Sequence, residues 1–189
     1  MATIRNEVLS DVCAREELLD RVWGPSRFEK TAERLREGRS PAAGLSLVAE
    51  RDYALVGTVR LWHVCAGPRR PALLLGPLAV EAAWRGMGIG SSLMRRAMAT
   101  ARRRGHRAVL LVGDASYYGR FGFSADKTGG LWLPGPFERH RLLGCELVAG
   151  ALDGARGLLG ATGRPAPTPS LDVPVAGLAR SDASARYAA

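Results

Sequence analysis

The sequence predicts an α/β fold, because helical and strand patterns alternate along the chain and the composition is that of a globular protein. Apolar residues make up 47% of the chain and charged residues 24%, which excludes a wholly disordered or fibrous protein. The length of 189 residues fits one domain with an appended tail. No apolar run is long enough for a transmembrane helix, and residues 1–11 lack the apolar core of a secretory signal.

The basic charge of the chain is a weak guide to its partners. Lys and Arg number 27 against 18 Asp and Glu, a formal net charge of +9. All the basic residues except Lys30 and Lys127 are arginine, a bias typical of GC-rich coding sequences, so the charge by itself does not indicate nucleic acid. The three cysteines are far apart and lack metal-ligand spacing. We therefore expect buried thiols in a reducing cytoplasm, without a bound metal or a membrane partner.

The N-terminal part of the chain predicts a strand followed by two helices. Residues 3–9 suit a short strand, and Asp11 can cap a helix that ends at Gly24, before a proline. Residues 26–29 fit the capping box S-x-x-E, in which each side chain satisfies a free backbone N–H. A second helix is therefore expected from this motif to the residues just before Gly38.

Three apolar segments then predict strands. Residues 44–51 and 53–65 are rich in Leu and Val and meet around Asp52, so they predict an antiparallel hairpin. Residues 72–80 form another apolar run, interrupted by the dipeptide Gly76-Pro77. Proline cannot donate to a strand ladder, so we expect a bulge or a splayed edge at this point.

One long helix and two further strands complete the expected domain. In residues 88–104 the apolar side chains recur on one helical face and arginines take the other, and Gly105 ends the helix. Residues 108–112 form a compact buried strand, and a short helix follows over residues 116–120. The last plausible strand covers residues 142–148.

The expected domain spans residues 1–150, and residues 151–189 form a tail rich in Gly, Ala and Pro. The tail shows no helix or strand period, and its alternating prolines favour an extended chain. Truncation after Leu159 is therefore expected to cost little stability. The opposing possibility is that residues 171–175 dock on a sheet edge or on a second subunit. The oligomeric state stays open, with a homodimer as one form.

Residues 85–91, with the sequence Arg-Gly-Met-Gly-Ile-Gly-Ser, lie between an apolar strand and the start of the long helix. Glycines let the backbone approach a ligand closely, and unpaired N–H groups at a helix N-terminus attract an anion. Arg85 adds a positive charge beside them. The ligand expected here is a phosphate, above all a pyrophosphate.

Three families of anion-binding loop compete for this segment. A Walker A loop requires Gly-Lys-Ser/Thr, which does not occur, so nucleoside triphosphate hydrolysis is excluded. A Rossmann fingerprint has two of its three glycines here, Gly86 and Gly88, and Asp114 closes the following strand. Against it, residues 81–85 separate the strand from the first glycine, and little chain remains for further βαβ units.

The third family fits the residues best. Arg85, Gly88 and Gly90 match the pattern Arg/Gln-x-x-Gly-x-Gly/Ala, which resembles the acetyl-CoA loop of the GNAT N-acetyltransferase superfamily. Residues 118–123, Tyr-Gly-Arg-Phe-Gly-Phe, resemble the Tyr-x-x-x-Gly-Phe ending of the same family. The ordered set of strand, loop, helix, strand and Tyr…Gly-Phe extends over residues 75–123.

This resemblance implies both a fold and an activity. The implied fold has a mixed, mostly antiparallel central sheet flanked by helices, in which the middle strands, containing residues 75–80 and 108–112, splay to admit acetyl-CoA. The implied activity is that of a bacterial N-acetyltransferase, which moves an acetyl group from acetyl-CoA to a primary amine of a small molecule or peptide by direct attack. The cofactor-binding residues implied are Leu78, Ala79, Val80, Arg85, Gly86, Met87, Gly88, Ile89, Gly90 and Ser91.

Direct transfer also needs a proton donor for the departing thiolate. A cysteine-like thiol has a pKa of about 8.5, and a tyrosine of pKa about 10 stays protonated at neutral pH and can supply the proton. Tyr118 is the expected acid, and Tyr117 is the alternative. Two carboxylates follow the strands of this region, but Glu81 also suits a solvated surface and Asp114 suits the cap of the short helix. No general base is assigned.

The acceptor pocket is expected between the first two helices and the irregular segment 121–137. The aromatic candidates for its lining, each of which also suits a core, are Trp23, Phe28, Trp132 and Phe137. No charge pattern identifies the acceptor. An alternative function is a non-catalytic CoA-sensing or nucleic-acid-binding module on the same fold, supported only by the arginines 102–104. A steep fall of affinity with salt would indicate the latter, because phosphate contacts release counterions.

Overall fold

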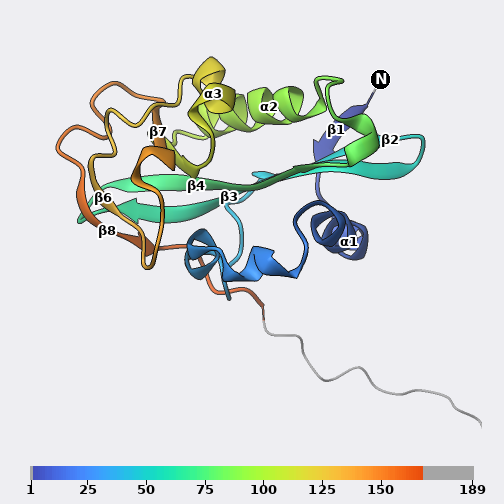
Figure 1. The fold of residues 1–189 in the computed structure, drawn as a ribbon, viewed down its shortest axis with the longest axis horizontal. Coiled ribbons are helices and arrows are strands. Elements are labelled where there is room, and N and C mark those ends of the chain that lie inside the picture. The colour runs from blue at the N-terminus through green and yellow to red at the C-terminus, as the bar shows by residue number, and fades with distance from the viewer. Residues whose placement is uncertain (1, 168–189) are drawn as a thin grey trace, which may run out of the picture.

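The structure is a computed structural model that describes residues 2–167 (Figure 1). Its strands are β1 (Thr3–Asn6), β2 (Ser46–Arg51), β3 (Ala54–Ala66), β4 (Pro71–Val80), β5 (Ala108–Val112), β6 (Gly130–Trp132), β7 (Leu142–Glu146) and β8 (Arg156–Ala161). Its α-helices are α1 (Val12–Trp23), α2 (Ile89–Arg103) and α3 (Ala115–Tyr118). Its 3-10 helices are η1 (Leu9–Asp11), η2 (Pro25–Glu29), η3 (Thr31–Leu35), η4 (Ala82–Trp84), η5 (Gly119–Phe121) and η6 (Arg139–Arg141). None of the helices within these residues is long and apolar enough to cross a membrane.

An open sheet separates two layers of helices. Its strand order is β1-β2-β3-β4-β5-β7, with β8 pairing to β3 and β6. The pairs β4–β5 and β6–β8 are parallel and the other pairs are antiparallel. α1, η2 and η3 lie on one face of the sheet, and α2 and α3 lie on the other (Figure 1). The predicted mixed, mostly antiparallel α/β fold is therefore confirmed.

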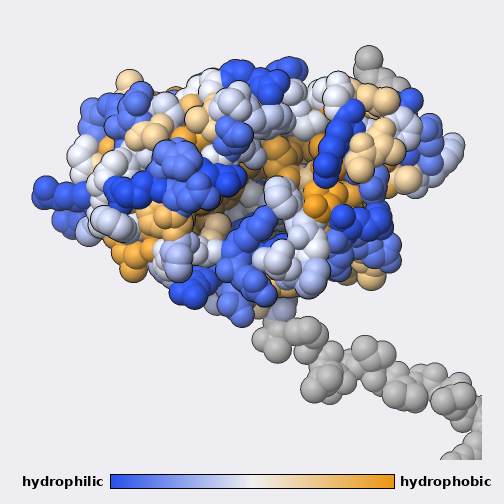
Figure 2. Space-filling model, in the orientation of Figure 1, coloured by the Kyte–Doolittle hydropathy of each residue, from blue (hydrophilic) through white to orange (hydrophobic). Residues whose placement is uncertain are grey.

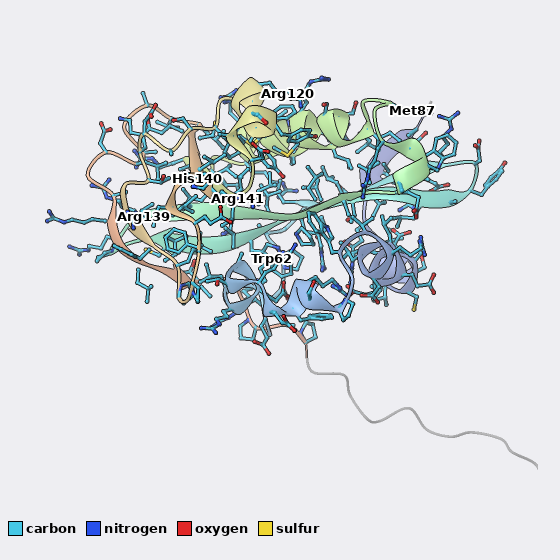
Figure 3. All side chains as sticks on the ribbon, viewed as in Figure 1. Trp62, Met87, Arg120, Arg139, His140 and Arg141 are labelled. Carbon is cyan, nitrogen blue, oxygen red and sulfur yellow. The ribbon has the colours of Figure 1, made fainter. Side chains whose placement is uncertain are left out.

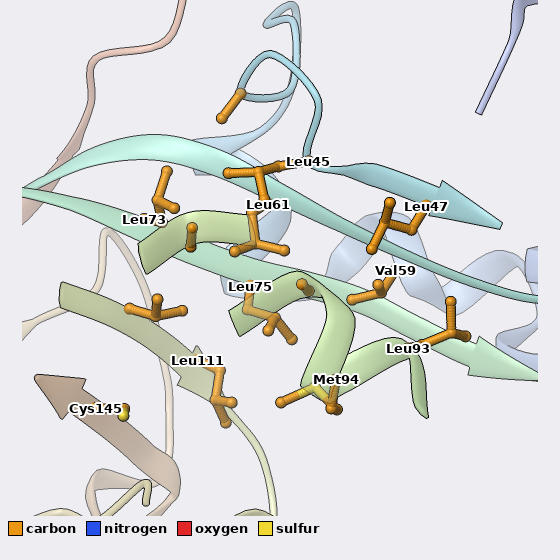
Figure 4. Close-up of a cluster of buried hydrophobic side chains, with 14 of the residues drawn as sticks. Leu45, Leu47, Val59, Leu61, Leu73, Leu75, Leu93, Met94, Leu111 and Cys145 are labelled. Carbon is orange, nitrogen blue, oxygen red and sulfur yellow. The ribbon is translucent and has the colours of Figure 1, made fainter. Parts of the chain in front are cut away.

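The main core fills the space between α2 and the sheet (Figure 4). Leu93, Met94 and Ala97 of α2 are fully buried, whereas Arg95 and Arg96 are exposed, as the amphipathic pattern predicts. Side chains of β4 alternate between the two faces. Leu73 and Leu75 pack in this core, and Leu74 packs in the core on the opposite face.

The two middle strands part from each other partway along β4. The parallel pairing of β4 with β5 is limited to Leu73 with Val109 and Leu74 with Leu110, although β4 continues to Val80. The register between β3 and β4 shifts opposite Gly76 and Pro77, which is the bulge that the proline predicts. Beyond Leu74 no strand within residues 2–167 pairs with the β5-facing edge of β4. The expected splay of the central strands is present.

The prediction of a second α-helix, from residue 26 to just before Gly38, is wrong. Residues 25–35 form two short 3-10 helices instead of one α-helix, because Lys30 between them has an extended backbone. The Ser26 hydroxyl donates to the carbonyl of Trp23 at 3.3 Å and so serves the end of α1, not the start of a new helix. Contacts distant in sequence hold the second piece. The Thr31 hydroxyl donates to the carbonyl of Pro136, and Arg34 Nη1 donates to the carbonyl of Pro134 at 2.6 Å.

The expectation that the last strand ends near Val148 is also wrong. β8 lies inside the segment expected to be an irregular tail, and it extends the sheet by pairing Gly160 with Cys65 of β3. Leu159 on this strand is 1% exposed. The glycines of β8 hide its periodicity, and its pairing with β3 supplies the stability that the local sequence lacks. Residues 168–189, with the segment 171–175, lie outside the described residues.

The expectation of buried thiols is correct for only one cysteine. Cys145 is buried on β7, Cys65 is half-buried and Cys13 is exposed on α1.

Candidate active site

A cleft of about 1380 Å³ lies at the opening between β4 and β5. One wall comes from β4, the start of α2 and α3, and the other from η2, η3 and residues 133–141. Because these elements lie on opposite faces of the sheet, the cleft reaches both helical layers. The face drawn in Figure 2 is hollowed here, and both hydrophilic and hydrophobic side chains border the hollow. Two ligands can therefore meet at the opening from opposite sides.

The start of α2 has backbone N–H groups to which an anion can bind. Gly88 is the N-cap residue, with a left-handed φ of +78°, and Gly86 before it has a φ of +79°. A Cβ on Gly88 would meet no atom within 4 Å, so the space above this backbone is open. The first intrahelical bond runs from Ser92 N–H to the Gly88 carbonyl at 2.9 Å, which leaves the N–H groups of residues 89–91 without an intrahelical acceptor.

All the predicted cofactor-binding residues except Met87 line the cleft. Arg85 Nε donates to the carbonyl of Val80 at 3.3 Å, which ties the loop to the end of β4. Met87 is 59% exposed, and its sulfur lies 3.9 Å from Arg51 Nη1 (Figure 3). The candidates that line the cleft are Leu78, Ala79, Val80, Arg85, Gly86, Gly88, Ile89, Gly90 and Ser91.

Both candidate tyrosines line the cleft, in different surroundings. The Tyr117 hydroxyl would lie 2.9 Å from a Cβ on Gly90, so it sits at the first turn of α2. The Tyr118 ring packs tightly against Gly113 and meets Phe123 edge-on, with 6.1 Å between ring centroids. Burial, assisted by Tyr117, raises the pKa of Tyr118 to about 12. Tyr118 therefore carries its proton at neutral pH.

The two nearby carboxylates are engaged in structural contacts. Glu81 accepts from Arg21 Nε at 2.9 Å and from the Ala82 N–H at 3.2 Å, and it does not line the cleft. Asp114 lies at the cleft but caps α3, since it accepts from the N–H and the hydroxyl of Ser116 at 3.0 and 2.9 Å. These hydrogen bonds hold the pKa of Asp114 below its usual range. Asp114 is the helix cap that the sequence predicts.

The acceptor side of the cleft differs from its prediction. Trp23 and Phe137 line it, whereas Phe28 and Trp132 are 58% and 51% exposed and lie outside its lining. The charged side chains here were not predicted. The cations that line this side are Arg27, Lys30, Arg34, Arg36 and Arg141.

The fold and the cleft define an α/β protein in which a helix start suited to an anion lies beside a pair of parted strands. Residues 42–125 match the family model of the Acetyltransferase (GNAT) domain. The Escherichia coli protein named Uncharacterized N-acetyltransferase YjhQ is 31% identical over 138 residues, which cover 70% of this chain and 76% of that protein. The chain belongs to the GNAT acetyltransferase family.

Solved structures of the same fold include complexes with CoA compounds. The Escherichia coli GNAT family N-acetyltransferase YhbS, in complex with CoA, superposes with a TM-score of 0.72 at 29% identity and covers 85% of this chain and 89% of that chain. A GNAT family acetyltransferase from Brucella melitensis, in complex with acetyl-CoA, gives a TM-score of 0.58 at 28% identity, over 81% and 99% of the two chains.

Proposed function

We propose that this protein is an N-acetyltransferase that moves the acetyl group of acetyl-CoA directly to a primary amine. The observation that carries the proposal is the cleft at the parted strands β4 and β5, which has a helix start with free N–H groups on one face of the sheet and continues to the other face. The CoA and acetyl-CoA bound to the two structural relatives support the choice of donor.

In this proposal the donor substrate lies on the α2 side. The N–H groups of residues 89–91 and the positive charge of Arg85 hold its pyrophosphate. The unpaired edge of β4 at residues 78–80 offers backbone groups to its extended pantetheine arm. The thioester then lies near the opening between the strands, within reach of the pocket on the other face.

The chemistry requires a neutral amine and a protonated leaving group. A lysine-like amine of pKa about 10.4 must give up a proton, at a cost of roughly 4.6 kcal/mol at pH 7. Its nitrogen then attacks the thioester carbonyl, the C–S bond breaks, and the sulfur takes the proton of the Tyr118 hydroxyl. The amine nitrogen loses its remaining extra proton to water, and Tyr118 recovers one from solvent.

Activity and donor binding can be tested separately on the purified chain. Calorimetry with acetyl-CoA measures binding, and a thiol reagent measures the CoA released when a panel of primary amines is added. We expect binding without an amine and thiol release only with one. Binding without any amine-dependent release would favour the CoA-sensing alternative, and absence of binding would refute the proposal.

A further inference from the structure

The guanidinium group of Arg36, just after η3, has protein partners for only part of its N–H donors within residues 2–167. The side chain is 7% exposed, its Nε donates to the carbonyl of Ala32 at 3.2 Å, and its Nη2 pairs with Glu33 at 2.8 Å. Nη1 has no protein partner within residues 2–167. It faces β4 and would lie 3.7 Å from a Cβ on Gly76. A guanidinium offers five N–H donors, so this one can still bind a second carboxylate.

Arg36 lies at the place where the strands part. Gly76 comes two residues after Leu74, the last residue of β4 that pairs with β5. The backbone is held there by Trp62, whose Nε1 donates to the Gly76 carbonyl at 2.6 Å. Both Arg36 and Gly76 line the cleft. An anion bound to Nη1 would therefore lie beside the point where the donor and the acceptor meet.

Two further cations surround the same space. Lys30 stacks over the Trp23 ring, with Nζ 3.7 Å from its centroid, and Arg141 comes from the segment between β6 and β7 (Figure 3). Burial lowers the pKa of Lys30, and the positive charges of Arg36 and Arg141 lower it further, so Lys30 lies close enough to both arginines to be repelled by them.

The carboxylates of this cleft do not fully compensate these cations. Glu33 is paired with Arg36, Asp114 caps α3, and Glu138 is shared between Arg141 at 3.6 Å and His140 at 3.4 Å. Glu29 lines the cleft as an exposed side chain. Lys30 has no salt bridge within residues 2–167. A bound anion would relieve this repulsion.

We propose that the acceptor is an amino acid or a similar compound with a carboxylate next to its amine, and that Arg36 Nη1 binds this carboxylate, with Lys30 and Arg141 beside it. The inference rests on the proposed function. Because Nη1 lies at the parting of the strands, a carboxylate held there places an amine on the neighbouring carbon beside the thioester. Arg36 thus selects the substrate and orients it, while the carboxylate itself is unchanged by the reaction.

The test compares matched acceptors with and without the carboxylate, and rates are compared per neutral amine because the pKa of the amine also differs among them. Leucine, leucinamide and 3-methylbutylamine, with the corresponding phenylalanine set, are assayed with acetyl-CoA for kcat/KM. We expect the free amino acids to exceed their amides and amines by about tenfold or more. Amides, simple amines or polyamines that react as well as the acids would overturn the inference and leave the proposed function intact. If no amine is acetylated at all, the proposed function fails as well.

Variants then connect the preference to Arg36. Arg36→Gln should lower the ratio of kcat/KM for acid over amide about tenfold. Arg36→Lys should keep part of the preference, and Arg96→Gln, on the exposed face of α2, is the control for one lost positive charge. If Arg36 had a purely structural role, its substitution would lower kcat/KM for both acceptors equally and leave the ratio of the two values unchanged. Because the ratio does not depend on the fraction folded, poor stability of the variant does not mask the result.

Discussion

The neighbouring residues Tyr117 and Tyr118 lie in different surroundings, so substitutions of the two should separate acetyl-CoA binding from catalysis. If Tyr118 protonates the leaving thiolate, Tyr118→Phe should lower kcat on the order of 10²-fold and leave acetyl-CoA affinity nearly intact, because its hydroxyl acts mainly in the transition state. Tyr117→Phe is the matched control. Its hydroxyl lies at Gly90 on the first turn of α2, so we expect a change in the KM for acetyl-CoA with a smaller effect on kcat. For both variants, steady-state kinetics measures kcat and KM, and calorimetry measures the acetyl-CoA affinity.

The pH profile gives the tyrosine assignment a second test. With a pKa raised to about 12, Tyr118 keeps its proton between pH 7 and 10, so we expect no fall of kcat from ionisation of this acid in that range. The rate should instead rise with pH as the acceptor amine loses its proton. A fall of kcat in this range would indicate an acid of lower pKa. Equal losses of binding and rate in Tyr118→Phe would indicate a packing role.

At the scale of elements, local patterns predict those parts of the fold in which one segment determines its own structure. The hairpin, α2 with its arginine face, and the bulge at Gly76 are examples, because periodicity or a proline marks each of them in the sequence. The second helix and β8 were mispredicted for a shared reason. Contacts with distant segments, the carbonyls of Pro134 and Pro136 in one case and β3 in the other, decide their conformation.

The start of α2 can be tested with two glycines that share one conformation. Gly88 and Gly105 lie at opposite ends of the helix, both have a φ of +78°, and a Cβ on either would meet no atom within 4 Å. Gly88→Val should weaken acetyl-CoA binding tenfold or more, which corresponds to about 1.4 kcal/mol, because the side chain would enter the space of the anion. Gly105→Val carries the same backbone strain and should leave the affinity unchanged. Equal effects in calorimetry would show that strain, not ligand contact, is responsible.

The role of β8 can be measured with adjacent leucines. Leu159 is 1% exposed and Leu158 is 59% exposed. Leu159→Ala should cost about 2–5 kcal/mol of folding free energy, or roughly 4–20 °C in Tm for a chain of this size, whereas Leu158→Ala should change Tm little. If Leu159→Ala melts like Leu158→Ala, β8 adds no stability, as the tail prediction had it.

At the scale of the whole molecule, the two halves of the cleft differ in how far the sequence predicts them. The donor half is contiguous, since one strand, one loop and one helix start supply it, so a short motif reveals it. The acceptor half is assembled from η2, η3 and residues 133–141, which are about a hundred residues apart in the chain. Arg36 illustrates the difference, because nothing in its local sequence distinguishes it from the surface arginines.

Because the cleft opens to both faces of the sheet, we expect the reaction to pass through a ternary complex of protein, donor and acceptor. Donor and acceptor can occupy their sides together, and none of the three cysteines lines the cleft within residues 2–167. Initial-rate measurements with both substrates varied should therefore give intersecting lines, the pattern of a ternary complex. Parallel lines, or an acetylated protein detected by mass spectrometry in the absence of acceptor, would instead indicate an acetyl-enzyme intermediate.

The unpaired edge of β4 also makes the stability of the sheet depend on whether a ligand is bound along that edge. Backbone amides beyond Leu74 that face β5 pair with no strand within residues 2–167, so in the empty protein their protons should exchange with solvent faster than those of the paired part of the same strand. A bound pantetheine arm would serve as a substitute strand, and its affinity would add to the stability of the fold by mass action, about 2.7 kcal/mol at a hundredfold excess over Kd. The cellular supply of acetyl-CoA would then set the lifetime of this protein as well as its rate of turnover.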